Sequence, residues 1–223
     1  MCVFFNSQKY IKIDLEIKEL LFSEGVGSII FLYYLFTVVS RALDIGLIVD
    51  ASANVAGKKL LRIRNFLKQI VASFTVSTSF TRVGMVEFGN YPRKLFDFNR
   101  FPNQATLINV LGRVPYMGGR AMLGKALKYS ALKLFSRSPR QKVAIVVTGR
   151  SRDSVAGPAR VLRRARVKVI LVGVGKCSIP QLQQMATNKR NVFTTKFTTL
   201  NNIVRAIKQK ASKGTLSTSE LLH

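Results

Sequence analysis

The residues best suited to chemistry lie in the segment DIGLIVDASAN, which covers residues 44–54. An apolar run ends in Asp50, and two polar residues, Ser52 and Asn54, follow it at a spacing of two. At the carboxyl end of a parallel strand the chain turns sharply, so side chains at this spacing can point into one crevice. Carboxylate, hydroxyl and amide oxygens are ligands for a hard divalent cation. The segment therefore predicts a cation site at the end of a buried strand.

Alternating strands and helices would have to position such a site. The apolar runs predict strands at 44–49, 82–88, 94–98, 142–147, 167–174 and 192–197. The helical spacing of apolar residues predicts helices at 58–74, 104–114, 122–135, 158–166, 179–186 and 200–211. This alternation, with one tight hairpin after residue 88, predicts an α/β fold with a doubly wound sheet and helices on both faces.

Five sequence blocks occur in a characteristic order and spacing. They are DIGLIVDASAN, RVGMVEFGN, YMGGRAMLGKAL, KVAIVVTGRSRDSV and VKVILVGVG. Together they resemble the von Willebrand factor type A domain of extracellular-matrix proteins such as matrilins and collagen VI, over about residues 43–212. The resemblance implies a Rossmann-like, mostly parallel six-stranded sheet with one antiparallel edge strand. It also implies adhesion or protein binding through a metal-ion-dependent adhesion site at the carboxyl edge of the sheet.

The resemblance places the ligands of that site residue by residue. Asp50 and Ser52 match the first two positions of the family's D-x-S-x-S motif, and Asn54 takes the place of the second serine. In the second loop of the site, Ala121 and Leu123 stand where the family has threonines, and neither side chain carries an oxygen. We therefore interpret Asp50, Ser52 and Asn54 as vestigial metal ligands.

The third loop of the site has lost its carboxylate. The family's T-D-G turn is reduced to Thr148 and Gly149, although Asp153 remains open as a substitute if the loop shifts. Arg120 and Arg150 stand near the expected cation position, and a guanidinium repels a divalent cation there by roughly a few kcal/mol. No cofactor is expected, with residual Mg²⁺ or Mn²⁺ binding left as the alternative.

Without a metal, the residues of the first loop need another role. We expect Asp50 to pair with a neighbouring arginine or to cap the following helix. We expect Ser52 to satisfy backbone donors in the turn.

The charge of the chain points to a second kind of ligand. It has 36 Lys and Arg against 10 Asp and Glu, and residues 1–43 hold four of each, so the whole charge of +26 lies after them. Such a field favours polyanions. Residues 162–167 follow the X-B-B-X-B-X pattern (B is basic) associated with heparin binding. On a helix Arg163 and Arg166 would share a face, with Arg160 and Arg164 on an adjoining one. These four arginines are the candidate polyanion site, and a solvated basic helix face is the alternative.

Enzyme chemistry has little support in the sequence. The single histidine is the last residue, His223, which excludes a histidine-based triad. Neither of the glycine-rich phosphate-binding motifs is present. Cys177 follows an apolar run and is expected to be a half-buried, inert thiol. We therefore expect a protein that is not an enzyme.

The two ends of the chain are expected to lie outside the domain. Residues 25–39 are apolar and shorter than the roughly 20 residues that span a bilayer. With the small residues Ser40 and Ala42 they predict a signal peptide or signal anchor in a leader at 1–42, followed by the domain at 43–212 and a flexible tail at 213–223. An extra packed apolar element, or a misassigned start methionine, remains open.

The expected product is thus secreted, or membrane-anchored if the leader is not cleaved, and has no stable membrane span after processing. Its expected partners are extracellular-matrix or cell-surface proteins, with sulfated glycosaminoglycan as an alternative ligand. Nucleic acid is disfavoured because few aromatic residues fall within the basic clusters. A degraded copy with no selected ligand is the remaining possibility.

Overall fold

The computed structural model describes residues 42–213 of the chain. The expected leader, apart from Ala42, and the expected tail, apart from Lys213, lie outside these residues. In this part of the chain no helix is long and apolar enough to cross a membrane.

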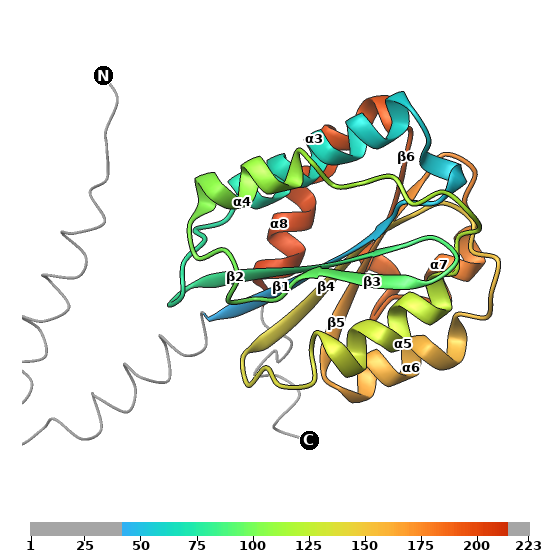
Figure 1. Cartoon of the computed structure of the whole chain (residues 1–223). Helices are drawn as coiled ribbons and strands as arrows, with labels where there is room; N and C mark the ends of the chain where they lie inside the picture. Colours follow the sequence, from blue (N-terminus) through green and yellow to red (C-terminus); the bar gives the residue numbers. More distant parts are fainter. Residues whose placement is uncertain (1–41, 214–223) are drawn as a thin grey trace, which may run out of the picture. The chain divides into compact units, whose positions relative to one another are not determined.

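Six strands form one sheet in the order β3-β2-β1-β4-β5-β6 (Figure 1). The strands are β1 (Leu43–Asp50), β2 (Thr81–Phe88), β3 (Pro92–Phe96), β4 (Gln141–Thr148), β5 (Val167–Val174) and β6 (Val192–Thr195). All neighbours pair in parallel except β2 and β3, which form the antiparallel edge. The predicted fold class is therefore confirmed.

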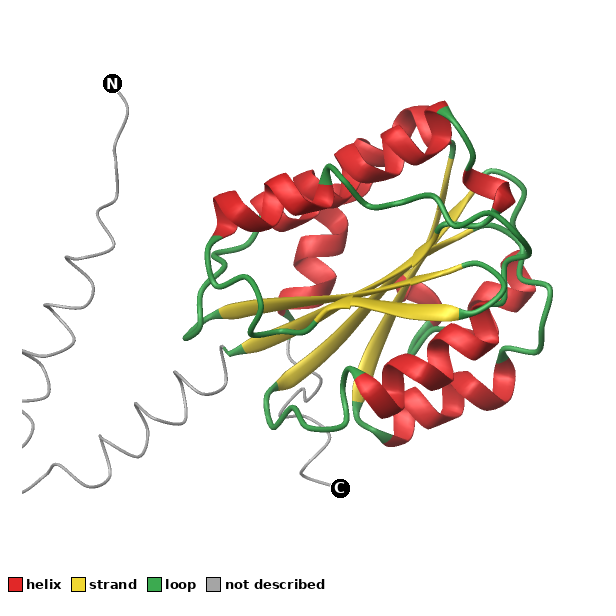
Figure 2. Ribbon diagram, in the orientation of Figure 1, coloured by secondary structure: helices red, strands yellow, loops and turns green. Residues whose placement is uncertain are grey.

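Helices cover both faces of this sheet, as Figure 2 shows. The α-helices are α3 (Lys58–Ala72), α4 (Gln104–Leu111), α5 (Leu123–Lys133), α6 (Ala156–Arg164), α7 (Ile179–Met185) and α8 (Val204–Ser212). Helices α3, α4 and α8 contribute to one hydrophobic cluster, and α5, α6 and α7 contribute to the cluster on the opposite face. The chain changes face between α4 and α5, where it passes from the β2–β3 side of β1 to β4.

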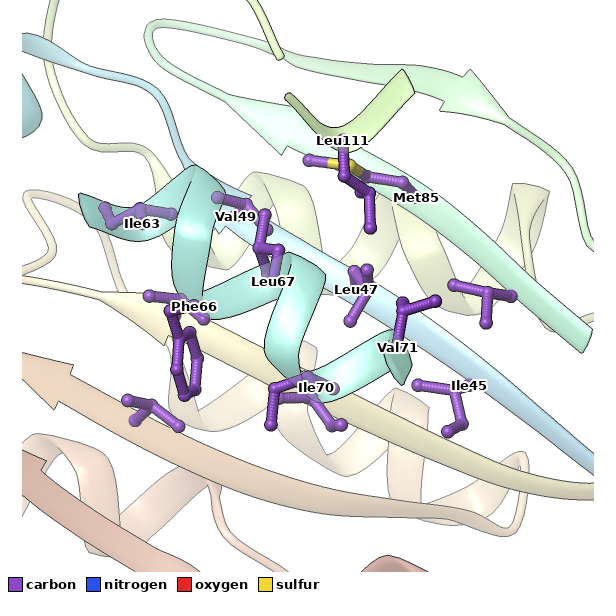
Figure 3. Close-up of a cluster of buried hydrophobic side chains, with 14 of the residues drawn as sticks. Ile45, Leu47, Val49, Ile63, Phe66, Leu67, Ile70, Val71, Met85 and Leu111 are labelled. Carbon is purple, nitrogen blue, oxygen red and sulfur yellow. The ribbon is translucent and has the colours of Figure 1, made fainter. Parts of the chain in front are cut away.

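Strand β1 is central because both faces of it are buried. Ile45, Leu47 and Val49 pack with α3, whose inner face carries Leu67 and Ile70 (Figure 3). The alternate residue Ile48 packs on the opposite face. Burying a side chain of this size stabilises the fold by about 1.5–3 kcal/mol, so the apolar run of β1 fixes the strand between two helical layers.

Two element boundaries differ from the sequence prediction. Strand β3 begins at Pro92 rather than at residue 94, because the first position of an edge strand tolerates the missing N–H of proline. The last predicted helix is divided into a 3₁₀ segment at Phe197–Ile203 and the α-helix α8. The other predicted strands and helices match observed elements to within three residues at each end.

The amino end of β1 carries a buried ion pair. The Asp44 carboxylate accepts hydrogen bonds from Arg82 Nε at 2.8 Å and from Arg82 Nη2 at 2.6 Å. Ser138, in the loop between α5 and β4, also donates to this carboxylate. Because a buried carboxylate requires hydrogen-bonding or charged partners, this contact ties β1 to β2 and to the loop after α5.

Gly46 on β1 gives a test of the packing beneath the sheet. A Cβ there would lie 2.2 Å from Cζ of Phe135, which is fully buried and cannot move away. We expect Gly46→Ala to lower the free energy of unfolding by about 1–3 kcal/mol in urea denaturation. The control is Gly157→Ala on α6, where a Cβ meets nothing within 4 Å and helix propensity predicts a gain of up to about 1 kcal/mol. Equal stability of the two variants would contradict the packing of Phe135 on β1.

Candidate functional site

Three loops meet at the carboxyl edge of the sheet, and backbone hydrogen bonds join them. The loops are 51–57 after β1, 112–122 before α5 and 149–155 after β4. Ala51 N donates to Phe88 O at 2.8 Å, and Ala51 O accepts from the N–H groups of Met117 at 2.9 Å and Gly118 at 3.1 Å. The first loop is thus held to β2 and to the second loop through one residue.

Glycine is required where the second loop passes the first. Gly118 and Gly119 have φ of 67° and 71°, which L side chains rarely adopt. Gly119 O accepts a hydrogen bond from Ala53 N at 3.0 Å, and Asn90 Oδ1 accepts one from Arg120 N at 2.8 Å. Asn90 was not identified from the sequence, because its partner is 30 residues away.

Asp50 is completely buried at this edge and bonds to backbone donors. Its Oδ1 accepts from Ser52 N at 2.9 Å and its Oδ2 accepts from Gly149 N at 3.4 Å. Burial raises the pKa of Asp50 above its ordinary value of 3.8, and the hydrogen bonds from Ser52 and Gly149 oppose this rise. Among the described residues Asp50 makes no ion pair, so the expected pairing with an arginine is wrong.

Ser52 has the backbone role that was predicted for it. Its hydroxyl accepts a hydrogen bond from Asn54 N at 3.3 Å and caps the short 3₁₀ helix at Ala53–Val55. Asn54 is exposed, and a Cβ on Gly149 would lie 3.6 Å from its Nδ2. The first and third loops are therefore adjacent at this point.

The second loop contributes no side-chain oxygen at its two predicted ligand positions. Ala121 and Leu123 are buried in the hydrophobic cluster beneath the sheet. Arg152 N donates to Ala121 O at 2.9 Å, which ties the third loop to the second. The oxygen-bearing side chains at the family's ligand positions are thus those of Asp50, Ser52 and Asn54, with one carboxylate among them.

Asp153 does not replace the missing aspartate. Its two carboxylate oxygens accept hydrogen bonds from Gly124 N and Lys125 N, each at 2.9 Å, and Ser151 Oγ donates to it at 2.7 Å. It therefore caps the amino terminus of α5, whose own N-cap residue, Met122, makes no side-chain capping bond. A Cβ on Gly124 would lie 2.0 Å from Ser154 O, so only glycine allows the third loop to approach α5 this closely.

Cationic side chains surround this edge. Arg120, Arg150 and Arg152 are exposed, and each lies in one of the loops that contact residues 50–54 or one another. Lys176 is also exposed, and its carbonyl would lie 3.7 Å from a Cβ on Gly149. The potential at the edge is therefore positive, which disfavours a bound divalent cation and favours an anionic group.

The predicted polyanion site on α6 is only partly available. Arg163 Nη1 donates to Gln184 O at 3.1 Å and to Met185 O at 3.3 Å, and so caps the carboxyl end of α7. Helix α6 ends at Arg164, and Arg166 has a left-handed φ of 56°, so the prediction that Arg163 and Arg166 share a helix face is wrong. Arg160, Arg164 and Arg166 are exposed, whereas Arg163 is half-buried.

The described residues leave few acidic groups to balance these cations. Residues 42–213 contain 32 Lys and Arg and five Asp and Glu. Three of the five acids form ion pairs, which are Asp44–Arg82, Glu87–Arg93 and Lys94–Asp97. The other two, Asp50 and Asp153, bond to backbone N–H groups. Most of the basic side chains in residues 42–213 therefore make no ion pair with an acid of the same range.

The sheet order, the change of face beside β1 and the loops at the carboxyl edge define a doubly wound α/β binding domain. Residues 44–209 match the sequence profile described as the von Willebrand factor type A domain. The chain belongs to that family.

The relatives include extracellular-matrix proteins. The collagen alpha-6(VI) chain of Mus musculus is 28% identical over 175 residues, which are 75% of this chain and 8% of that protein. Matrilin-1 of Gallus gallus is 30% identical over 178 residues, which are 76% of this chain and 36% of that protein. The chain thus spans no more than about a third of the length of these relatives.

Solved structures share the fold. Proximal thread matrix protein 1 from the mussel byssus has a TM-score of 0.73 at 25% identity, over 78% of this chain and 47% of that one. A further structure of the mussel protein has zinc in its metal-ion-dependent adhesion site. The expected extracellular-matrix type of the domain is confirmed by these relatives.

Replacing Asp153 tests its assignment as a helix cap. We expect Asp153→Ala to lower the free energy of unfolding by about 1–2 kcal/mol, because two N–H groups of α5 lose their acceptor. Urea denaturation with and without Mg²⁺ measures the effect, and the loss should be the same in both. The control is Asp97→Ala, which removes an exposed ion pair worth up to about 1 kcal/mol. A loss that appears only with Mg²⁺ would instead assign Asp153 to a metal.

Proposed function

We propose that this chain is a non-catalytic protein-interaction domain of an extracellular-matrix type protein, and that its adhesion edge works without a bound metal. The main support is the set of side chains at the ligand positions of the edge. Three of them carry oxygen, and both carboxylate oxygens of Asp50 and the hydroxyl oxygen of Ser52 already accept backbone hydrogen bonds.

The chemistry of the donor set fits a hard cation poorly. Mg²⁺ requires near-octahedral coordination by oxygen, gives up its waters reluctantly and is usually held by one or two carboxylates. Here the one carboxylate is buried, and both of its oxygens accept backbone hydrogen bonds. Ala121, Leu123 and Gly149 supply no side-chain oxygen, and the residue that could have compensated, Asp153, caps α5.

Exposed arginines give the carboxyl edge of the sheet a positive charge, which in a metal-bound site the cation would supply. Arg120, Arg150 and Arg152 lie at the edge, and guanidinium groups bind carboxylates through two parallel hydrogen bonds. An acidic surface on a matrix or cell-surface protein is the partner that this edge would accept. The proposed domain covers residues 43–212, and the proposed location is extracellular, as for the collagen VI and matrilin relatives.

The absence of catalysis is also a proposal. Cys177 is half-buried, and burial raises the pKa of its thiol, which makes it a poor nucleophile at neutral pH. The single histidine is His223, at the end of the chain. The buried acids Asp44 and Glu87 each bind an arginine, as structural carboxylates do.

Metal titration tests the proposed function directly. A ligand that binds only the folded state raises stability by RT ln(1 + [L]/Kd). Because we propose that the edge binds no cation, we expect millimolar Mg²⁺ or Mn²⁺ to leave the melting temperature unchanged. Differential scanning fluorimetry at constant ionic strength measures this, with Ca²⁺ as a control for non-specific effects. A rise in melting temperature that disappears in Asp50→Ala would overturn metal independence.

A second candidate function is polyanion binding, with sulfated glycosaminoglycan favoured over nucleic acid. The observation that supports it is the charge of residues 42–213, which contain 32 basic and five acidic residues. Each of the five acids already forms an ion pair or accepts a backbone hydrogen bond. The exposed members of the α6 site, Arg160, Arg164 and Arg166, would contribute to this attraction.

Chromatography on immobilised heparin tests this candidate. We expect the chain to elute at a salt concentration well above that of a matrix-type A domain with a net charge near zero, because each basic contact releases counterions. A sulfonate cation exchanger is the control, since it measures charge alone. Elution from heparin at lower salt than from the sulfonate resin would remove specific polyanion binding from consideration.

A further inference from the structure

A groove runs between helix α5 and the edge strand β3, from beside the carboxyl edge of the sheet towards the amino end of β2. Its first section is a pocket of about 270 Å³ lined by Pro92, Lys125, Lys128, Tyr129, Leu132 and Lys133. Its second section is a pocket of about 670 Å³ near the amino end of β2, whose lining includes Arg82, Lys94, Phe98 and Arg137. Leu132 and Lys133 line both pockets, so the two sections are neighbours along α5. We name this feature the α5–β3 groove.

Basic side chains follow the groove along its length. Lys125, Lys128 and Lys133 lie on α5 and are exposed, and the first and last are separated by about 12 Å of helix rise. Arg137 continues the row in the following loop. The acidic residue that lines the groove, Asp97, is paired with Lys94 at 2.8 Å. Five residues of helix, at 3.6 residues per turn, place Lys128 and Lys133 on opposite flanks of Leu132, so the positive charge is spread along and across the groove.

The walls of the groove are fixed and partly apolar. Arg82 is held by Asp44 and by Asn99 Oδ1 at 2.6 Å, so its position does not depend on a ligand. Pro92, Tyr129 and Leu132 form an apolar strip beside the lysines. A ligand for this groove needs repeated anionic groups along its length and apolar C–H surface between them.

We propose that the α5–β3 groove binds a sulfated polysaccharide chain. The lysines and Arg137 contact successive sulfate groups, with the guanidinium able to bind bidentately, while the sugar rings lie on the strip of Tyr129 and Leu132. This inference rests on the polyanion-binding candidate function and places its main site on α5 instead of α6. The arginines of α6 then add long-range attraction, because Arg163 is committed to α7.

Other polyanionic partners fit the groove less well. Single-stranded nucleic acid requires exposed aromatic rings for stacking, but Tyr129 is half-buried and Phe98 is buried. An acidic peptide could add a strand to the open edge of β3, but Pro92 on that strand lacks the N–H that such pairing needs. A polysaccharide needs neither stacking nor a strand partner.

Two matched variants of the full chain test the groove. The groove variant carries Lys128→Glu and Lys133→Glu, and the control carries Arg160→Glu and Arg164→Glu, so both change the net charge equally on exposed helical positions. The probe is a fluorescent heparin oligosaccharide of defined length, measured by anisotropy at several salt concentrations. We expect the groove variant to lose about tenfold or more in affinity and its salt slope to fall by about two, and the control to lose about threefold or less.

Each outcome supports or overturns the groove. If the wild-type chain does not bind heparin, the polyanion function and the groove both fail. If it binds and the control loses as much as the groove variant, or more, the function stands and the groove is overturned. Single-stranded DNA of equal charge that binds as tightly, and with the same loss in the groove variant, would overturn the assignment to polysaccharide. If the glutamate variant does not fold, Lys128→Gln with Lys133→Gln keeps the side-chain stems and should give a smaller loss in the same order.

Discussion

The arrangement of the carboxyl edge depends on the backbone of Ala51. Its N–H binds the end of β2, and its carbonyl accepts two hydrogen bonds from the loop before α5. Asp50 adds a bond to Gly149 in the third loop. Since buried backbone groups must be paired, these bonds hold three loops in register whatever ligand the edge binds.

This explains how the edge can differ so much from the family's metal site while the fold is retained. The two lost threonine positions are occupied by Ala121 and Leu123, which join the core beneath the sheet. The third loop remains in place because Asp153 caps α5 and Gly124 allows a close approach of the two backbones. Packing and capping thus stabilise the loops at this edge.

Basic side chains of the domain also bind backbone groups. With five acids available, several cations bind carbonyl oxygens at the ends of helices and loops instead. Arg163 binds the carboxyl end of α7, Lys168 binds Lys210 O and Lys213 O at the end of α8, and Arg64 binds Val114 O. Burial and the nearby Lys210 and Lys213 lower the pKa of Lys168, in keeping with a domain whose positive charges repel one another. Most of the remaining basic side chains of residues 42–213 are exposed, where they favour anionic partners.

Much of the fold could be predicted from the sequence, because buried parallel strands are continuous apolar runs and helices carry a periodic apolar face. The run from Asp44 to Val49 and the five blocks identified the domain and located Asp50, Ser52 and Asn54 at its edge. The roles of these residues, and of Asp153, Arg163 and Asn90, depended on partners far away in the chain. Asp153 bonds to residues 28 and 29 positions away, and Arg163 bonds to carbonyl groups 21 and 22 positions away. Lys128 lines a pocket together with Pro92 of the edge strand, and the periodicity of a helix cannot predict such a neighbour. Local pattern therefore determined the elements and their order, whereas only tertiary structure decided which polar groups are committed within the fold and which remain available, because hydrogen bonds and grooves form between segments that the chain brings together from afar.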